Sequence, residues 1–274
     1  MITRARSLAV IGVGNMASAI IAGIVSSDIK LSNIILYDSN TSQYDKLNSG
    51  TIPYIYAGSI SDAVRLADCV LLSVKPQNYN DVLSEISKID GCEGKIYISI
   101  GAGISSDSVS EALNNACVIR VLPNVPMFIG KGVSVICQNP LVSTDDFEFV
   151  CAIFRSAGSV LIIDECEMNR IIGVTSSSPA YVFKFINAIY QGALSQGLPD
   201  RDLLNAICDT VIGSALMLKS SSDTPEELIS RVASKGGTTE QALLKLDEYK
   251  LDEAVAEAML ACTRRADELG GNKK

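Results

Sequence analysis

A glycine motif near the start of the chain constrains the fold more than any other feature. Gly12-Val13-Gly14-Asn15-Met16-Ala17 has the pattern G-x-G-x-x-A, directly after the apolar run 7–12 and at the start of a helix-like run at 15–26. In a strand–turn–helix unit, the first glycine allows a tight turn, the second lets the backbone approach a pyrophosphate, and a small third residue lets helix and strand pack closely. The motif predicts a dinucleotide site; a glycine-rich turn in another α/β fold is the alternative.

Short β-rich runs alternate with helix-like segments through the first half of the chain. Continuous apolar strands separated by helices are typical of a parallel sheet that is covered on both faces. The expected strands lie at 7–12, 33–37, 69–74, 95–100, 118–122 and 133–137, and the expected helices at 15–26, 62–67, 81–89 and 106–114.

The second half of the chain has almost no β-rich run after about residue 165. Its helical periodicity predicts helices at 179–197, 199–220, 224–233, 238–246 and 251–269. We therefore expect an α/β protein with a Rossmann-type parallel-sheet domain at 1–164 and an all-α domain at 165–274. Apolar helices rich in small residues are more typical of a subunit interface than of a monomer surface, so the helical domain is expected to form a homodimer.

Composition excludes or disfavours several classes of function. The 274 residues carry a formal net charge of -8, which argues against nucleic acid as a partner because binding phosphates requires a basic face. The chain has no histidine, and its eight cysteines form no CxxC pair, which predicts free thiols, no metal site and a reducing, cytoplasmic compartment. The sequence has no apolar run of about 18 residues, the length that a membrane-spanning helix requires, so no membrane span is expected.

Asp38 stands at the end of the second expected strand and is followed by Ser39. An acid at this position usually accepts hydrogen bonds from ribose hydroxyls and repels a 2′-phosphate. No arginine follows closely to bind such a phosphate. The segment therefore favours NADH over NADPH, with a solvated turn aspartate as the alternative.

The missing histidine bears on the chemistry. Oxidation of a hydroxyl group needs a base, whereas an imine protonates readily near neutral pH and then accepts a hydride, so orientation and an anchor for the substrate matter most. The segment 234–240 (SKGGTTE) offers such an anchor: amides at Gly237, Thr238 and Thr239 can bind a carboxylate, and the Thr239 hydroxyl can meet a ring nitrogen. Plain capping of the following helix is the alternative.

Six segments together resemble the pyrroline-5-carboxylate reductase family, and they occur in the family's order. They are IGVGNMASAIIAGI (11–24), LLSVKPQ (71–77), SIGAGIS (99–105), VIRVLPNVP (118–126), SSSPAYVFKFI (176–186) and SKGGTTEQALLKL (234–246). The resemblance implies reduction of the C=N bond of 1-pyrroline-5-carboxylate to L-proline by NADPH or NADH, the last step of proline biosynthesis. It also implies homodimers that assemble into a decamer.

The resemblance assigns roles to the matching positions. The cofactor is expected to contact Ile11, Gly12, Val13, Gly14, Asn15, Met16, Ser73, Val74, Lys75, Pro76, Ile100, Gly101 and Ala102, with Asn124 near the nicotinamide. The substrate carboxylate is expected to lie among Ser234, Gly237, Thr238 and Thr239, and the Thr239 hydroxyl to act on the ring nitrogen as the catalytic group.

Positions that depart from the family's pattern include Ile60, where the family often has an asparagine that helps hold the nucleotide. Ser176 and Ser178 stand where the family has the glycines of S-G-S-G-P-A, and Lys235 replaces the proline of S-P-G-G. Two other functions stay open: a β-hydroxyacid dehydrogenase-like enzyme with Lys184 as its catalytic lysine, and a non-catalytic sensor that binds NAD(P). An assay of NAD(P)H oxidation with pyrroline-5-carboxylate separates these possibilities.

Overall fold

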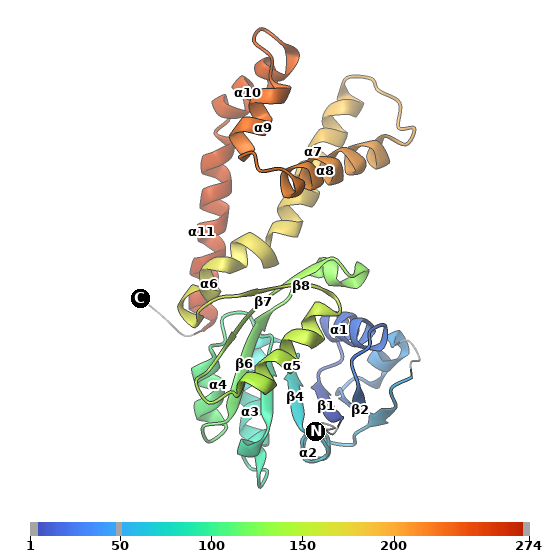
Figure 1. Cartoon of the computed structure of the whole chain (residues 1–274), viewed down its shortest axis with the longest axis vertical. Coiled ribbons are helices and arrows are strands. Elements are labelled where there is room, and N and C mark those ends of the chain that lie inside the picture. The colour runs from blue at the N-terminus through green and yellow to red at the C-terminus, as the bar shows by residue number, and fades with distance from the viewer. Residues whose placement is uncertain (1–4, 48–50, 271–274) are drawn as a thin grey trace. The chain divides into compact units, whose positions relative to one another are not determined.

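The computed structural model describes residues 5–47 and 51–270, which form two compact units (Figure 1). One unit comprises the residues up to Ser177 together with those from Leu260 onward, and the other comprises Ser178–Met259. This division by contacts differs from the expected boundary at 164 and 165, because Met168 and Ala266 share a buried cluster with Leu122 of the sheet. The boundary expected from the sequence pattern stays a prediction.

The first unit is built around an eight-stranded sheet of order β3-β2-β1-β4-β5-β6-β7-β8. The strands are β1 (Arg6–Ile11), β2 (Leu31–Tyr37), β3 (Tyr54–Tyr56), β4 (Cys69–Leu72), β5 (Ile96–Ser99), β6 (Cys117–Leu122), β7 (Gly132–Gln138) and β8 (Gly158–Ile162). β1 to β6 are parallel, which confirms the predicted Rossmann-type sheet. β7 is antiparallel to β6, because a 3₁₀ turn at Val125–Ile129, and no crossover helix, joins the two strands. β8 is parallel to β7, and a helix at Thr144–Arg155 joins them.

Helices cover both faces of this sheet (Figure 1). One apolar layer packs under α1 (Asn15–Val25) and α5 (Thr144–Arg155), and the other packs under α2 (Ile60–Leu66), α3 (Tyr79–Ile86) and α4 (Ser106–Ala112). α6 (Met168–Ile171) leads into a π-helical turn at Ile172–Ser176. The continuous apolar strands are therefore buried on both sides, as the sequence predicted.

The second unit is helical, as expected. It contains α7 (Ser178–Ser195), α8 (Leu203–Ser220), α9 (Pro225–Val232), α10 (Thr238–Glu248) and the part of α11 (Leu251–Leu269) that ends at Met259. Large apolar side chains remain exposed on it, among them Phe183 at 61%, Leu216 at 60% and Val232 at 65%. So much exposed apolar surface indicates a protein partner.

Helix α8 differs from one expectation. Among the described residues it is the one helix that is long and apolar enough to cross a membrane, judged by its length and its mean hydropathy of 1.3 alone. From the sequence, no such segment was expected. A helix at the interface of a dimer has the same composition, so the property does not by itself indicate a membrane.

Candidate cofactor and substrate sites

The turn after β1 has the geometry that the glycine motif requires. Gly12 has a φ of +90°, and a Cβ atom there would lie 2.9 Å from the carbonyl oxygen of Ser73, so only glycine fits. Gly14 is the N-cap of α1 with no side-chain cap, and a Cβ atom on it would meet no described atom within 4 Å. The first amides of α1 therefore face open space and can bind a pyrophosphate. These residues fit a dinucleotide cofactor.

Asp38 follows β2 and faces this turn. Its Oδ2 accepts a hydrogen bond from the Val13 amide at 2.6 Å, and its Oδ1 accepts one from the Asn40 amide at 2.8 Å. The half-buried carboxylate therefore holds the glycine turn in place. Asp38 is thus not the solvated turn residue that the alternative hypothesis described. Each oxygen keeps a lone pair that a ribose hydroxyl could use, and Ser39 is exposed beside it.

The loops that follow β4 and β5 lie next to the glycine turn. The Ser73 amide donates to the Ile11 carbonyl oxygen at 2.9 Å, and the Ile100 amide donates to the Leu72 carbonyl oxygen at 3.3 Å. Ser73–Pro76 and Ile100–Ala102 are therefore brought together with the motif at the carboxyl edge of the parallel strands. This edge is where open α/β sheets bind ligands.

Tyr79 supports these loops, and the sequence analysis missed it. Its hydroxyl donates to the Leu72 carbonyl oxygen at 2.8 Å and accepts from the Ser99 hydroxyl at 3.2 Å. A Cβ atom on Gly101 would lie 2.7 Å from the Tyr79 ring, so the glycine is required by this packing. Burial raises the pKa of Tyr79 to about 12, and the side chain therefore stays neutral. The only sign of this supporting role in the sequence is the position of the tyrosine shortly after Pro76.

Lys46 is a second residue that the sequence analysis missed. Its ammonium group lies 3.1 Å from the Oδ1 atom of Asn15, the first residue of α1. No arginine follows Asp38 closely, but a lysine at the end of the following 3₁₀ turn, Thr41–Lys46, brings a positive charge to the same region.

Asn124 is buried, and each of its two side-chain polar atoms makes one hydrogen bond to the backbone. Its Oδ1 accepts from the Val133 amide at 2.8 Å, and its Nδ2 donates to the Thr175 carbonyl oxygen at 3.0 Å. The side chain therefore joins the β6–β7 turn to the π-helical turn, and its proximity to a nicotinamide stays a prediction. At the end of the same π-helical turn, the buried hydroxyl of Ser176 has no hydrogen-bond partner among the described residues.

The predicted substrate segment lies in the second unit, between α9 and α10. Gly237 is the N-cap of α10 and no side chain caps this helix, so the threonines are not capping residues as the alternative proposed. The amides of Thr238 and Thr239 belong to the first turn, where the backbone has no intrahelical acceptor. They form a potential carboxylate site.

One expected donor in this segment is already engaged. The Gly237 amide donates to the Ser234 carbonyl oxygen at 2.9 Å, which corrects the expectation that this amide is free for substrate. A Cβ atom on Gly237 would lie 2.6 Å from the Ser234 hydroxyl oxygen, so the serine side chain packs directly against the glycine. Gly236, with a φ of +74°, donates its amide to Glu240 at 2.8 Å.

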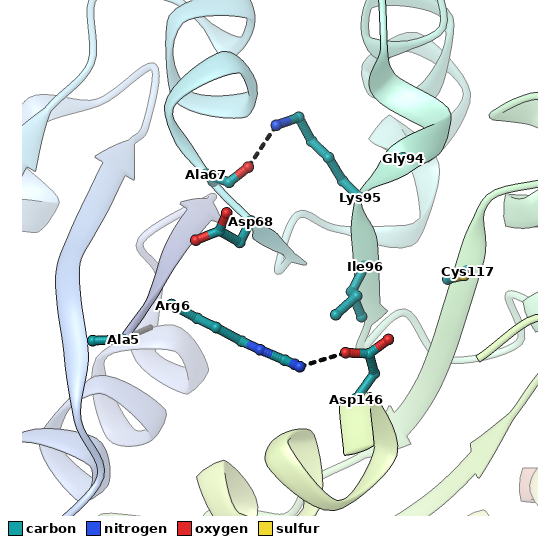
Figure 2. A pocket seen from close by; sticks show the side chains of 9 residues that line it. All are labelled: Ala5, Arg6, Ala67, Asp68, Gly94, Lys95, Ile96, Cys117 and Asp146. Carbon is teal, nitrogen blue, oxygen red and sulfur yellow. Dashed lines mark hydrogen bonds and ion pairs between the residues drawn. The ribbon is translucent and has the colours of Figure 1, made fainter. Parts of the chain in front are cut away.

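A cavity of about 400 Å³ lies elsewhere on the first unit, at the amino ends of β1, β4, β5 and β6. Figure 2 shows Arg6 directed at Asp146 and Lys95 directed at the Ala67 carbonyl oxygen, pairs of 2.6 Å and 2.5 Å. The remaining charged group of the lining, Asp68, accepts from the Ser7 hydroxyl at 2.7 Å. The cofactor residues lie at the opposite, carboxyl edge, so this cavity is not the candidate site.

A second cavity, of about 610 Å³, is also lined by none of the predicted site residues. At its wall, buried Arg120 forms an ion pair with Glu165 at 2.5 Å and donates to Asn169 at 2.6 Å. Asn169 in turn donates to Asp267 of α11 at 2.8 Å. This network holds β6, α6 and the end of α11 together, and we assign it a structural role.

The cysteines are free thiols. Among the described residues, none of the eight is paired in a disulfide, and no group of three or more potential metal ligands is present. Burial raises the pKa of the Cys69 thiol to about 12, which disfavours the nucleophilic thiolate.

Comparison with known proteins gives matches along nearly the whole chain. Residues 165–269 match the family described as pyrroline-5-carboxylate reductase dimerisation, and residues 7–103 match the family described as NADP oxidoreductase, coenzyme F420-dependent. The chain is 33% identical over 266 residues to the pyrroline-5-carboxylate reductase of Escherichia coli, covering 96% of this chain and 98% of the relative.

Two crystal structures resemble the fold closely. The 1-pyrroline-5-carboxylate reductase of Streptococcus pyogenes superposes with a TM-score of 0.87 at 30% identity, over 96% of this chain and 99% of that chain. The pyrroline carboxylate reductase of Plasmodium falciparum, solved with NADP bound, superposes with a TM-score of 0.85 at 27% identity, over 97% and 98%.

Proposed function

The chain belongs to the pyrroline-5-carboxylate reductase family, and from that premise we propose that it reduces 1-pyrroline-5-carboxylate to L-proline with NADPH or NADH. The observation that carries the proposal is the glycine turn, in which Gly12 has no room for a side chain and Gly14 leaves the first amides of α1 open. The bound nicotinamide supplies the hydride; the protein supplies binding and orientation.

On this proposal the cofactor lies along the carboxyl edge of the sheet. The glycine turn takes the pyrophosphate, Asp38 and Ser39 take a ribose, and the loops after β4 and β5 line the rest. The hydrogen bonds that join Asp38 and the loop after β4 to the turn, and the loop after β5 to β4, support the assignment. The proposed cofactor residues are Ile11, Gly12, Val13, Gly14, Asn15, Met16, Asp38, Ser39, Ser73, Val74, Lys75, Pro76, Ile100, Gly101, Ala102 and Asn124.

The substrate carboxylate is proposed to bind the amides of Thr238 and Thr239, with Ser234 and Gly237 forming the adjacent turn. The uncapped start of α10 supports this, because its amides and its dipole both favour an anion. The Thr239 hydroxyl then donates to or accepts from the ring nitrogen and aligns the C=N bond for hydride transfer. An imine needs no strong base, which agrees with a chain that has no histidine.

The assembly is a dimer of the helical domains, which the match to the dimerisation family and the exposed apolar side chains support. We propose further that dimers assemble into a decamer and that the protein works in the cytoplasm with no membrane or nucleic-acid partner. Eight free thiols agree with a reducing compartment. The match over residues 165–269 supports a domain boundary at 164 and 165.

Neither alternative function is favoured by the relatives, whose similarity extends over nearly the whole chain. The test is oxidation of NADH and of NADPH with pyrroline-5-carboxylate, a set of β-hydroxyacids assayed in the reverse direction, and cofactor titration without substrate. The proposal predicts turnover with pyrroline-5-carboxylate alone. Turnover of a hydroxyacid, or binding of cofactor without any turnover, would reject it.

A further inference from the structure

A lysine ammonium group lies beside the glycine turn, where the adenosine end of a dinucleotide is proposed to bind. Lys46 Nζ is 3.1 Å from Asn15 Oδ1 and 2.7 Å from Gln43 Oε1. Both partners are neutral, and no ion pair joins Lys46 to a carboxylate in residues 5–47 or 51–270. Its positive charge is therefore available to an anion.

The chain geometry explains how Lys46 reaches this place. β2 ends at Tyr37, and the 3₁₀ turn Thr41–Lys46 then brings its last residue to the start of α1. The Asn40 side chain caps this turn by accepting from the Ser42 amide at 3.2 Å. The side chain of Lys46 is exposed and donates to two neutral amide oxygens. Because water can replace both contacts at the surface, the ammonium group can turn toward a ligand.

The acidic group in the same region already accepts two protein hydrogen bonds and keeps a lone pair on each oxygen for a ribose hydroxyl. Both carboxylate oxygens of Asp38 accept backbone amides, from Val13 and from Asn40, so the residue clamps the turn whichever cofactor binds. Asp45 is exposed beside Lys46. In Rossmann-type sites an acid at the end of the second strand takes the ribose 2′-hydroxyl, and a basic side chain nearby accommodates a 2′-phosphate.

We propose that Lys46 is the residue through which this chain accepts the 2′-phosphate of NADPH. The inference rests on the proposed cofactor site and adds a specificity-determining residue to it. The ammonium group acts as a point charge toward the phosphate, while Asn15 keeps it beside the glycine turn when that phosphate is absent. Asp38 and Lys46 thus favour opposite cofactors from the same loop.

The test compares two probes that differ only in the 2′-phosphate: adenosine 2′,5′-bisphosphate and adenosine 5′-monophosphate. Their affinities are measured by calorimetry at constant ionic strength for the parent protein, Lys46→Met and Lys46→Arg. Lys30→Met is the matched control, because Lys30 is exposed and precedes the amino end of β2, away from the turn. Circular dichroism verifies that each variant is folded.

We expect Lys46→Met to weaken binding of the bisphosphate about tenfold and binding of the monophosphate less than about twofold. Lys46→Arg should retain most of the affinity, and Lys30→Met should match the parent. Equal losses for both probes, or no loss for either, would overturn the role of Lys46 while leaving the cofactor site in place. If the parent binds neither probe, the proposed cofactor site itself is wrong.

Discussion

Replacing Thr239 with alanine separates catalysis from folding. Since Gly237 caps α10 without help from a side chain, the threonine hydroxyl contributes no cap. Removing the hydroxyl should therefore not cost the roughly 1 kcal/mol of unfolding free energy that a cap contributes. Alanine is also the better helix former, so the melting temperature should stay unchanged or rise slightly. A hydrogen bond to a charged partner contributes about 1.5–3 kcal/mol, so kcat/KM should fall roughly ten- to a hundredfold.

The assay is steady-state oxidation of NAD(P)H together with thermal melting on Thr239→Ala and Thr239→Ser, the second of which keeps the hydroxyl. Thr224→Ala is the matched control, because Thr224 does cap its helix: it accepts from the Glu227 amide at 3.3 Å in a capping box. The control should melt lower and keep its kinetics. If Thr239→Ala instead melts lower and turns over at close to the parent rate, the threonine is structural and the catalytic assignment fails.

Three further outcomes are expected. The parent should use NADH at least as well as NADPH because of Asp38, and a preference for NADPH above about tenfold in kcat/KM, roughly 1.4 kcal/mol, would contradict this. Sedimentation at micromolar concentration should give a dimer or a larger assembly. An active monomer would contradict the proposal that the exposed apolar side chains of the helical unit form a subunit interface. Ser176→Ala should raise the melting temperature by about 2–4 °C for each kcal/mol of unfolding free energy gained, because it removes a buried hydroxyl that has no hydrogen-bond partner among the described residues. A lower melting temperature would show that the hydroxyl has a partner.

The sequence predicted the fold wherever the apolar pattern was long and continuous. Six strands were expected close to their observed positions, since burial on both faces leaves an unbroken apolar run. The helices of the second half were expected close to theirs because of their helical periodicity. β3 and β8 were missed because they are short edge strands with exposed side chains, such as Tyr56 at 58%. The reversal at β7 depends on the short Pro-containing turn after β6, which strand patterns alone do not encode.

The candidate site was predictable where a residue type has one physical use. Gly12 is required because a Cβ atom there would meet the Ser73 carbonyl oxygen, and the motif predicts Gly14 for the close approach of a pyrophosphate. Tyr79 and Lys46 were not predictable, because their roles arise from partners in other loops. The engaged amide of Gly237 likewise depends on a local turn with Ser234, which the residue types do not specify.

The central claim is that this chain transfers a hydride from the nicotinamide to the imine carbon of pyrroline-5-carboxylate. The most direct test uses NADH carrying deuterium at the transferred position of C4, a single turnover with pyrroline-5-carboxylate, and mass spectrometry of the product. The account predicts L-proline heavier by one deuterium, located at C5. Unlabelled proline, or no proline while the cofactor remains bound and reduced, would contradict it.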